Sequence, residues 1–202
     1  MSLQPATARL RRGGLVKHGL CRAWLQCLAG LLFVSSPAFA DHAAIEAGRT
    51  MLVDGVYRVG ARVIFDMDEK VQEALDNGVP LVVDFEIELV RKRSWLWPEQ
   101  IVDIRQRYQM HYHALSRRYI VRDITDGGQM SFRYISDALD SMGNVYNVAL
   151  IAADKIDDPD DYLVRMRAVF DVEALPTPIR LWAYFGSDWK LTGSWTQWPL
   201  TP

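Results

Sequence analysis

Hydrophobic and polar residues alternate with a period of two along several segments of this chain, the pattern of a β-strand with one buried and one solvent-facing side. The longest such segments are residues 57–65, 83–89, 102–113 and 162–172. Residues 119–124 and 129–134 flank Asp126-Gly127-Gly128, a sequence typical of hairpin turns. Residues 145–152 are apolar and indicate either a strand, which we prefer, or a short helix. Most of the regular structure is therefore expected to be β.

Segments 83–89 and 102–113 are expected to pair as an antiparallel hairpin, because each has one apolar and one charged side. Symmetric closure of the connecting loop gives four cross-strand pairs: Phe85 with Tyr108, Leu89 with Ile104, Glu88 with Arg105 and Glu86 with Arg107. A slip by one residue would turn the carboxylates into the core, so the register is expected to be well specified.

Two short helices are predicted between the strands. The first begins near Asp66, which is able to cap it while Glu69 reaches back, and it ends at Gly78 and Pro80. The second covers residues 136–142 and ends at the following glycine.

These elements favour a mainly antiparallel β-sandwich with two short helices, and a partly closed barrel is the alternative.

Residues 41–202 are expected to form one domain, in which residues 41–50 are small, polar and loosely ordered. Residues 175–202 are rich in proline and tryptophan and are expected to pack on the domain, because a free tail would not carry so many aromatic rings. These rings are Trp182, Tyr184, Phe185, Trp189, Trp195 and Trp198.

Residues 1–40 predict a secretory signal peptide. Five basic residues and no acid precede or enter an apolar run, Ala23 to Val34, and the segment ends in Ala38-Phe39-Ala40, a small-x-small pattern that signal peptidase accepts. Cleavage after Ala40 would place the mature protein in the periplasm. The apolar run is shorter than the ~20 residues of a membrane span. No apolar run of 18 residues occurs after Ala40, so no transmembrane anchor is expected after cleavage.

Removal of this leader changes which chemistry the chain can support. Both cysteines, Cys21 and Cys27, lie inside it, which excludes disulfides and thiolate catalysis from the mature protein. Loss of the five basic residues moves the formal net charge from -2 to -7. An acidic protein lacks the basic footprint that nucleic acid requires, so we expect no nucleic-acid partner.

Five motifs occur in the order found in the DUF4390 family of exported Gram-negative bacterial proteins, which this chain resembles from about residue 56 to 200. They are Ala74-Leu75-Asp76-Asn77-Gly78-Val79-Pro80-Leu81, Trp95-Leu96-Trp97, the run from Tyr112 to Tyr119, the run from Glu173 to Arg180, and Asp188-Trp189 with the run from Ser194 to Pro199. Thr177 departs from the pattern, which has leucine there. The family has no known function, so the resemblance implies no catalytic residue. Its genes often lie beside those of a nitrogen-type membrane sensor kinase, which implies a link to signalling at the inner membrane.

The most suggestive surface is the predicted loop at residues 91–98, where three cations precede Trp95 and Trp97. Arginine and tryptophan favour protein contacts and membrane interfaces, so Arg93 and both tryptophans are candidate partner-binding residues. Trp189, Trp195 and Trp198 of the tail are further candidates. The competing interpretation is that Trp95 and Trp97 cap the end of the sandwich or meet the aromatic tail. Arg117 and Arg118 are expected to belong to a turn and a salt-bridge network.

Metal sites are considered at two places and expected at neither. His111 and His113 lie two residues apart on one strand face, close enough to share a metal if neighbouring carboxylates complete the shell. The alternative is a polar strand face with His113 hydrogen-bonded near the turn at residues 115–117. The acidic loop at residues 154–161 has aspartates for calcium but lacks the usual glycine and is interrupted by Pro159. We expect no cofactor.

The mature chain contains no G-x-S-x-G elbow and no phosphate-binding loop, so no catalytic residue is assigned. We expect a non-enzymatic periplasmic binding or accessory protein that recognises an envelope protein, and Trp95 and Trp97 are also candidates for peripheral membrane contact. One alternative is a carrier of a small apolar ligand, in which four inward side chains line a cavity: Tyr108, Met110, Tyr112 and Phe170. A hydrolase is the third hypothesis.

Overall fold

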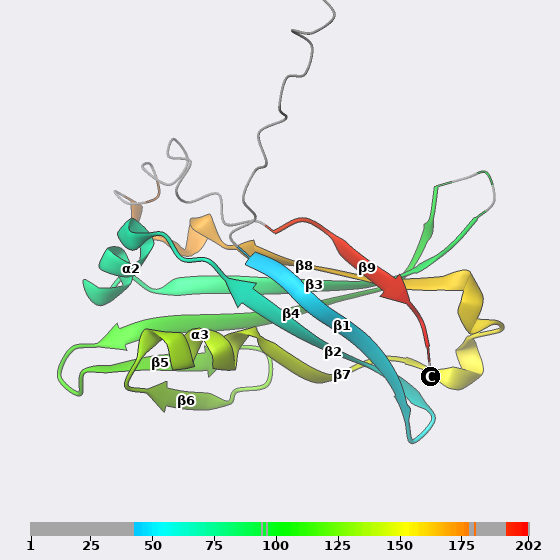
Figure 1. The fold of residues 1–202 in the computed structure, drawn as a ribbon, viewed down its shortest axis with the longest axis horizontal. Helices are drawn as coiled ribbons and strands as arrows, with labels where there is room; N and C mark the ends of the chain where they lie inside the picture. Colours follow the sequence, from blue (N-terminus) through cyan, green and yellow to red (C-terminus); the bar gives the residue numbers. More distant parts are fainter. Residues whose placement is uncertain (1–42, 94, 96, 178–179, 181–192, 202) are drawn as a thin grey trace, which may run out of the picture. The chain divides into compact units, whose positions relative to one another are not determined.

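The computed structural model describes residues 43–93, 95, 97–177, 180 and 193–201, and within them two antiparallel sheets pack on one another (Figure 1). The first sheet has the order β1-β2-β7, with β1 (Ala43–Val53), β2 (Val56–Phe65) and β7 (Asn144–Ala152). The second has the order β6-β5-β4-β3-β8-β9, with β3 (Leu81–Arg91), β4 (Glu99–His113), β5 (Arg118–Asp123), β6 (Gln129–Phe132), β8 (Tyr162–Phe170) and β9 (Thr196–Pro199). The predicted β-sandwich is confirmed, and neither sheet of these residues closes into a barrel.

The described part of the segment 41–50, which was expected to be loosely ordered, is regular structure. From Ala43 onward it belongs to β1, which pairs along its whole length with β2. The turn between these strands is Asp54-Gly55, and both residues have positive φ, 51° and 73°. This is the backbone conformation of a two-residue hairpin turn whose twist matches the flanking strands.

The β3–β4 hairpin is confirmed, but its register differs by two residues from the symmetric one. Asp84 lies opposite Arg107 and Glu86 opposite Arg105, whereas the expected partners were Glu86 with Arg107 and Glu88 with Arg105. A two-residue shift leaves every side chain on its expected face. The cause is the loop, which closes the hairpin asymmetrically with Arg91 opposite Glu99, and a bulge between Leu89 and Val90 then changes the register by one residue.

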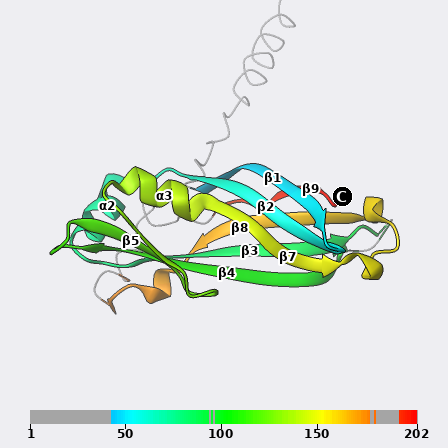
Figure 2. The same ribbon diagram turned by 90° about the horizontal axis from the view of Figure 1, so that it is seen from below.

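Two helices connect the sheets. Helix α2 (Glu69–Asp76) is capped by Asp68, whose carboxylate accepts from the Lys70 backbone N–H at 2.9 Å, so the cap lies two residues after the expected Asp66. Helix α3 (Ile135–Gly143) leads directly into β7, as Figure 2 shows. In the described residues, no helix is long and apolar enough to cross a membrane.

Three short 3-10 turns complete the described structure: η1 (Ala153–Lys155), η2 (Pro159–Asp161) and η3 (Val172–Ala174). The last of these follows β8, so Val172, which was expected to extend the strand, lies beyond its end. Strand β9 was not expected, and it pairs with β8 at the edge of the second sheet. Trp182, Tyr184, Phe185 and Trp189 lie outside the described residues.

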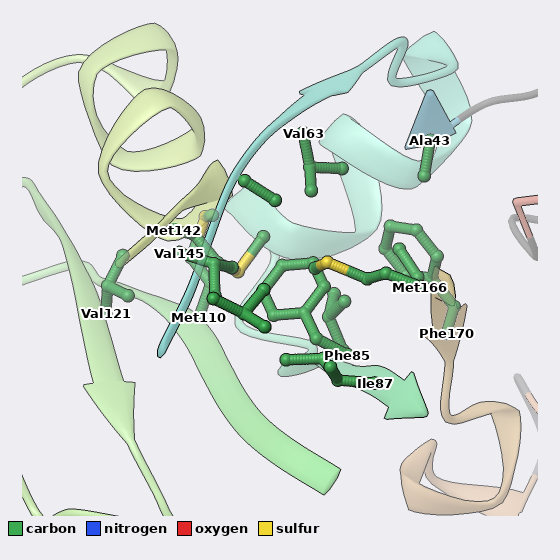
Figure 3. Packing of buried hydrophobic residues seen from close by; sticks show 14 of the residues in the cluster. Ala43, Val63, Phe85, Ile87, Met110, Val121, Met142, Val145, Met166 and Phe170 are labelled. Carbon is green, nitrogen blue, oxygen red and sulfur yellow. The ribbon is translucent and has the colours of Figure 1, made fainter. Parts of the chain in front are cut away.

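The core lies between the sheets and is filled by side chains from both. Phe85, Met110 and Met166 of the six-stranded sheet and Met142 of α3 are at most 1 % exposed and lie close together (Figure 3). The ring of Phe65 on β2 contacts those of Phe85 and of Phe170 on β8, with ring centroids 6.3 and 5.9 Å apart. Because protein cores are packed as densely as organic crystals, each of these rings fixes the separation of the two sheets.

Candidate functional site

The outward face of β3 carries a row of three carboxylates between two rows of arginines. Asp84 accepts two hydrogen bonds from the Arg107 guanidinium, both at 2.7 Å. Glu86 accepts from Arg105 at 3.0 Å on one side and from Arg167 at 2.7 Å on the other. Glu88 is paired with Arg165 of β8. Each carboxylate of the row is therefore neutralised by a neighbouring strand.

The ring of Trp195 stacks against the guanidinium groups of two arginines of this ion-paired face. The guanidinium carbons of Arg165 and Arg167 are 4.8 and 4.6 Å from the ring centroid, within cation–π range. Asp84 is buried, with only 5 % of the residue exposed. Its carboxylate raises the pKa of Arg107, chiefly through the hydrogen bond between the two side chains. The geometry is that of a structural charge network, in which Trp195 is a layer over the sheet.

The β3–β4 hairpin tip, residues 92–98, presents both tryptophans of the candidate surface to solvent. Trp95 is 88 % exposed and Trp97 is 89 % exposed, so they do not cap the sandwich or meet the aromatic residues described in the tail. The carboxylate of Glu99 pairs with Arg93 at the base of the tip. Large apolar side chains exposed to this degree, with a cation beside them, are typical of interaction surfaces.

The base of the tip is fixed to the acidic loop that precedes β8. The backbone N–H of Lys92 donates to the carbonyl of Asp161 at 2.7 Å, and its Nζ donates to the carbonyl of Asp160 at 2.7 Å. The Arg91 guanidinium lies 3.6 Å from the Asp157 carboxylate. The acidic loop thus anchors the basic base of the hairpin, and the two tryptophans extend from a braced support.

The acidic loop has a second structural role in its own turns. The carboxylate of Asp158 accepts from the Asp160 backbone N–H at 3.0 Å and caps η2. Over the part of the chain that the structure describes, no three His, Cys, Asp or Glu side chains are grouped so that they could hold a metal ion.

The two histidines of β4 are placed differently from one another. His113 is exposed, and its Nδ1 lies 2.9 Å from the Ser116 hydroxyl, as expected for a histidine near the turn. His111 is half-buried, and its pKa is lowered by desolvation first and then by the charges of Arg122 and His113. The neighbours of this pair are cationic and would oppose a divalent metal.

The four residues considered for a ligand cavity lie in or against one core cluster, but they do not line a common cleft. Met110 is fully buried and Phe170 is 7 % exposed in the core. Tyr108 lines a cleft of about 490 Å³ between the β5–β6 hairpin and the start of β7, together with Tyr146. Tyr112 lines a different cleft, beyond the end of β4.

Trp198, the last of the candidate tail residues in the described part, belongs to the sheet. It lies on β9 and packs partly buried against the core, where its indole N–H has no hydrogen-bond partner. A Cβ placed on Gly48 would lie 2.5 Å from this ring, so the absence of a side chain at Gly48 leaves room for the indole to pack on β1. Trp189 is outside the described residues.

Sequence reasoning missed one cluster, formed by Arg117, Arg118 and Arg133 with Tyr134 around the cleft beyond β4. Arg117 lies in the turn, whereas Arg118 is the first residue of β5. The expected salt-bridge network is absent among the described residues, where Arg118 binds Ser131 and Arg117 has no acidic partner. The available signal was an arginine pair at a hairpin turn that contains no glycine.

A family model described as "Domain of unknown function (DUF4390)" matches residues 40–199. No curated protein and no solved structure matches the chain.

Proposed function

Since the chain belongs to the DUF4390 family, a domain of unknown function, we propose its role from its own surface: a non-enzymatic binding protein of the periplasm that recognises an envelope protein through the β3–β4 hairpin tip. The observation that carries the proposal is the exposure of Trp95 and Trp97, 88 and 89 %, on a support fixed by ion pairs and hydrogen bonds. The signal peptide expected from residues 1–40 supports the compartment.

The energy available from these two side chains is large enough for specific recognition. A tryptophan buries roughly 200 Å² when covered, which at ~25 cal/mol per Å² corresponds to about 5 kcal/mol per ring before the costs of association. Because β3 and β4 hold the ends of the tip and the acidic loop braces its base, less conformational entropy is lost on binding than for a free loop.

The charged face of β3 supports a binding role over a hydrolytic one. Paired carboxylates that act as acid and base need different environments, one of them raised in pKa by an apolar site. Here Glu86 and Glu88 each bind arginine, so the two carboxylates lie in the same kind of charged environment.

The test is crosslinking through the tip, followed by recovery of partners from the bacterial envelope. Lys92 supplies the amine, and the mature wild-type protein is compared with the double variant Trp95→Ala plus Trp97→Ala. An inner-membrane sensor kinase is the first partner to look for among the crosslinked proteins. We expect a specific partner, crosslinked at Lys92, to be lost in the double variant.

The matched control is Tyr146→Ala plus Met130→Ala, which removes two exposed apolar side chains, 72 and 53 % exposed, from another surface. Far-ultraviolet circular dichroism checks that both double variants keep the sheet content. Unchanged recovery of every partner by the tip variant would reject the tip as the contact.

A further inference from the structure

The opposite end of β4 from the hairpin tip carries a second cleft, of about 490 Å³. We call it the arginine cleft, because Arg117, Arg118 and Arg133 line it together with Ser116 and three tyrosines. The arginines come from two places in the chain, the β4–β5 turn with the start of β5, and the segment between β6 and α3. The turn and this segment are brought side by side by the pairing of Tyr119 with Phe132.

Within the described part of the chain, the positive charges of the arginine cleft are not paired with acids. Elsewhere the arginines of β4 and β8 bind the carboxylates of β3, but among the described residues neither Arg117 nor Arg133 has an ion-pair partner. Arg118 donates to the Ser131 hydroxyl and carbonyl at 3.1 and 2.8 Å. A carboxylate does lie nearby, that of Asp76, and it accepts the hydroxyl of Tyr119 at 2.6 Å. Three guanidinium groups therefore share one cleft in a chain whose net charge is negative.

The backbone under the cleft adds a second observation. Arg117 has φ 50°, in the left-handed region where glycine or asparagine is usual, and its N–H donates to the carbonyl of Ala114 at 3.3 Å to close the turn. A long cationic side chain at a position that favours glycine is backbone strain of the kind that clusters at ligand sites. The turn also exposes Leu115, which is 95 % accessible beside the cleft, and Tyr134 at its rim is 62 % exposed.

From this arrangement we infer that the arginine cleft binds a phosphate-bearing anion. Guanidinium groups match phosphate oxygens with pairs of parallel N–H bonds, which explains why arginine and not lysine would be used at such a site. The hydroxyl of Tyr134 is free among the described residues to donate to the same oxygens. A phosphorylated soluble molecule and the headgroup of an anionic phospholipid share this chemistry, and exposed Leu115 fits the lipid source in particular.

The experiment uses two probes, inorganic phosphate by isothermal titration calorimetry, and cosedimentation with vesicles of phosphatidylglycerol against vesicles of phosphatidylcholine. The test variant is Arg117→Gly plus Arg133→Gln, in which glycine keeps the left-handed turn. The control is Arg62→Gln plus Arg122→Gln, two exposed arginines outside the cleft that give the same loss of charge.

We expect the test variant to weaken binding about 10-fold for each arginine lost, as for hydrogen bonds to a charged group, while the control stays within about twofold of wild type. Binding of phosphate supports a soluble ligand, and binding of phosphatidylglycerol vesicles without phosphate supports a lipid headgroup. Failure of both probes with wild type, or equal weakening in test and control variants, would overturn the inference. Both double variants retain the tryptophan tip, so vesicle binding through the tip would be equal in the two and would not produce the expected difference between them.

Discussion

Replacement of Gly143 by alanine sets two physical effects against one another. The residue ends α3, where alanine is favoured over glycine by roughly 0.5–1 kcal/mol because it restricts the unfolded chain and suits a helix. A Cβ at this position, however, would lie 2.1 Å from the carbonyl oxygen of Val63 on β2. Real Cβ atoms essentially never approach another heavy atom closer than 3.0 Å, so helix or strand would have to move by about 1 Å.

The obstacle is the backbone of Val63, which is paired with Ile45 of β1, so it cannot rotate away like a side chain. Overpacking of this kind costs typically ~1–3 kcal/mol, and we place Gly143→Ala near the upper end because the ring of Phe65 also lies 3.3 Å from the added atom. After the helix preference is subtracted, a net loss of about 2 kcal/mol remains. For a domain of this size that lowers Tm by roughly 4–8 °C.

Thermal unfolding followed by circular dichroism, with urea titration for the free energy, measures the effect. Gly128→Ala is the control, because the nearest heavy atom to its added Cβ is 3.9 Å away and no positive φ opposes the substitution. We expect the control to keep its Tm within about 2 °C, as for a surface substitution. A Gly143→Ala protein as stable as wild type, or more so, would refute the argument that α3 rests directly on the β2 backbone.

Three further outcomes are expected. Asp84→Asn keeps the shape of the side chain but removes the charge that holds Arg107, and should lower the free energy of unfolding by about 1–2 kcal/mol in urea titration, the lower part of the range for charged hydrogen bonds because Arg107 is partly exposed. Burial, and then the hydrogen bond to Asp76, raises the pKa of Tyr119 from 10.0 to about 12, which favours the neutral hydroxyl in the folded state. This contribution is complete below pH 10 and lost between pH 10 and 12, so a Tm series over that range should fall more steeply for wild type than for Tyr119→Phe. Gly48→Ala should push the Trp198 indole off β1 and cost about 1–3 kcal/mol, and adding Trp198→Leu should recover part of that loss, whereas strictly additive losses would contradict the contact.

Strand positions and faces followed from the sequence because the alternation is strong where one side of a strand meets the core. Val83, Phe85 and Ile87 are buried, and the acids between them face outward, as the pattern predicts. The register did not follow, because it depends on the loop and on the bulge after Leu89, and a two-residue shift preserves the alternation. The pattern also could not show that Glu86 has arginine partners on both sides, since the second comes from β8, distant in sequence.

The edges of the two sheets were harder to predict. Strand β1 has a weak alternation, and its signal was the Asp54-Gly55 turn behind it, a hairpin sequence that composition alone does not reveal. Strand β9 is only four residues long and ends in Pro199, as edge strands allow. Its position explains why Trp198 packs on Gly48, although an aromatic-rich tail suggested several free contact residues.

The arginine cleft was hidden for a different reason. Arg117 and Arg133 are separated by a hairpin, and only the β5–β6 pairing brings their segments together. The exposure of Trp95 and Trp97 was likewise open in the sequence, because a tryptophan pair in a loop is equally compatible with a buried cap.

Strand β4 runs without interruption for 15 residues from the base of the tryptophan tip to the turn that holds Arg117. At ~3.4 Å per residue it separates these two surfaces by roughly 50 Å, more than the width of a bilayer's hydrocarbon core, about 30 Å. One small ligand therefore cannot occupy both surfaces. When this protein is bound through one of them, the other stays accessible. The length of β4 therefore sets the distance between the arginine cleft and the tryptophan tip. A ligand or surface bound at the cleft would be held at that distance from the tip.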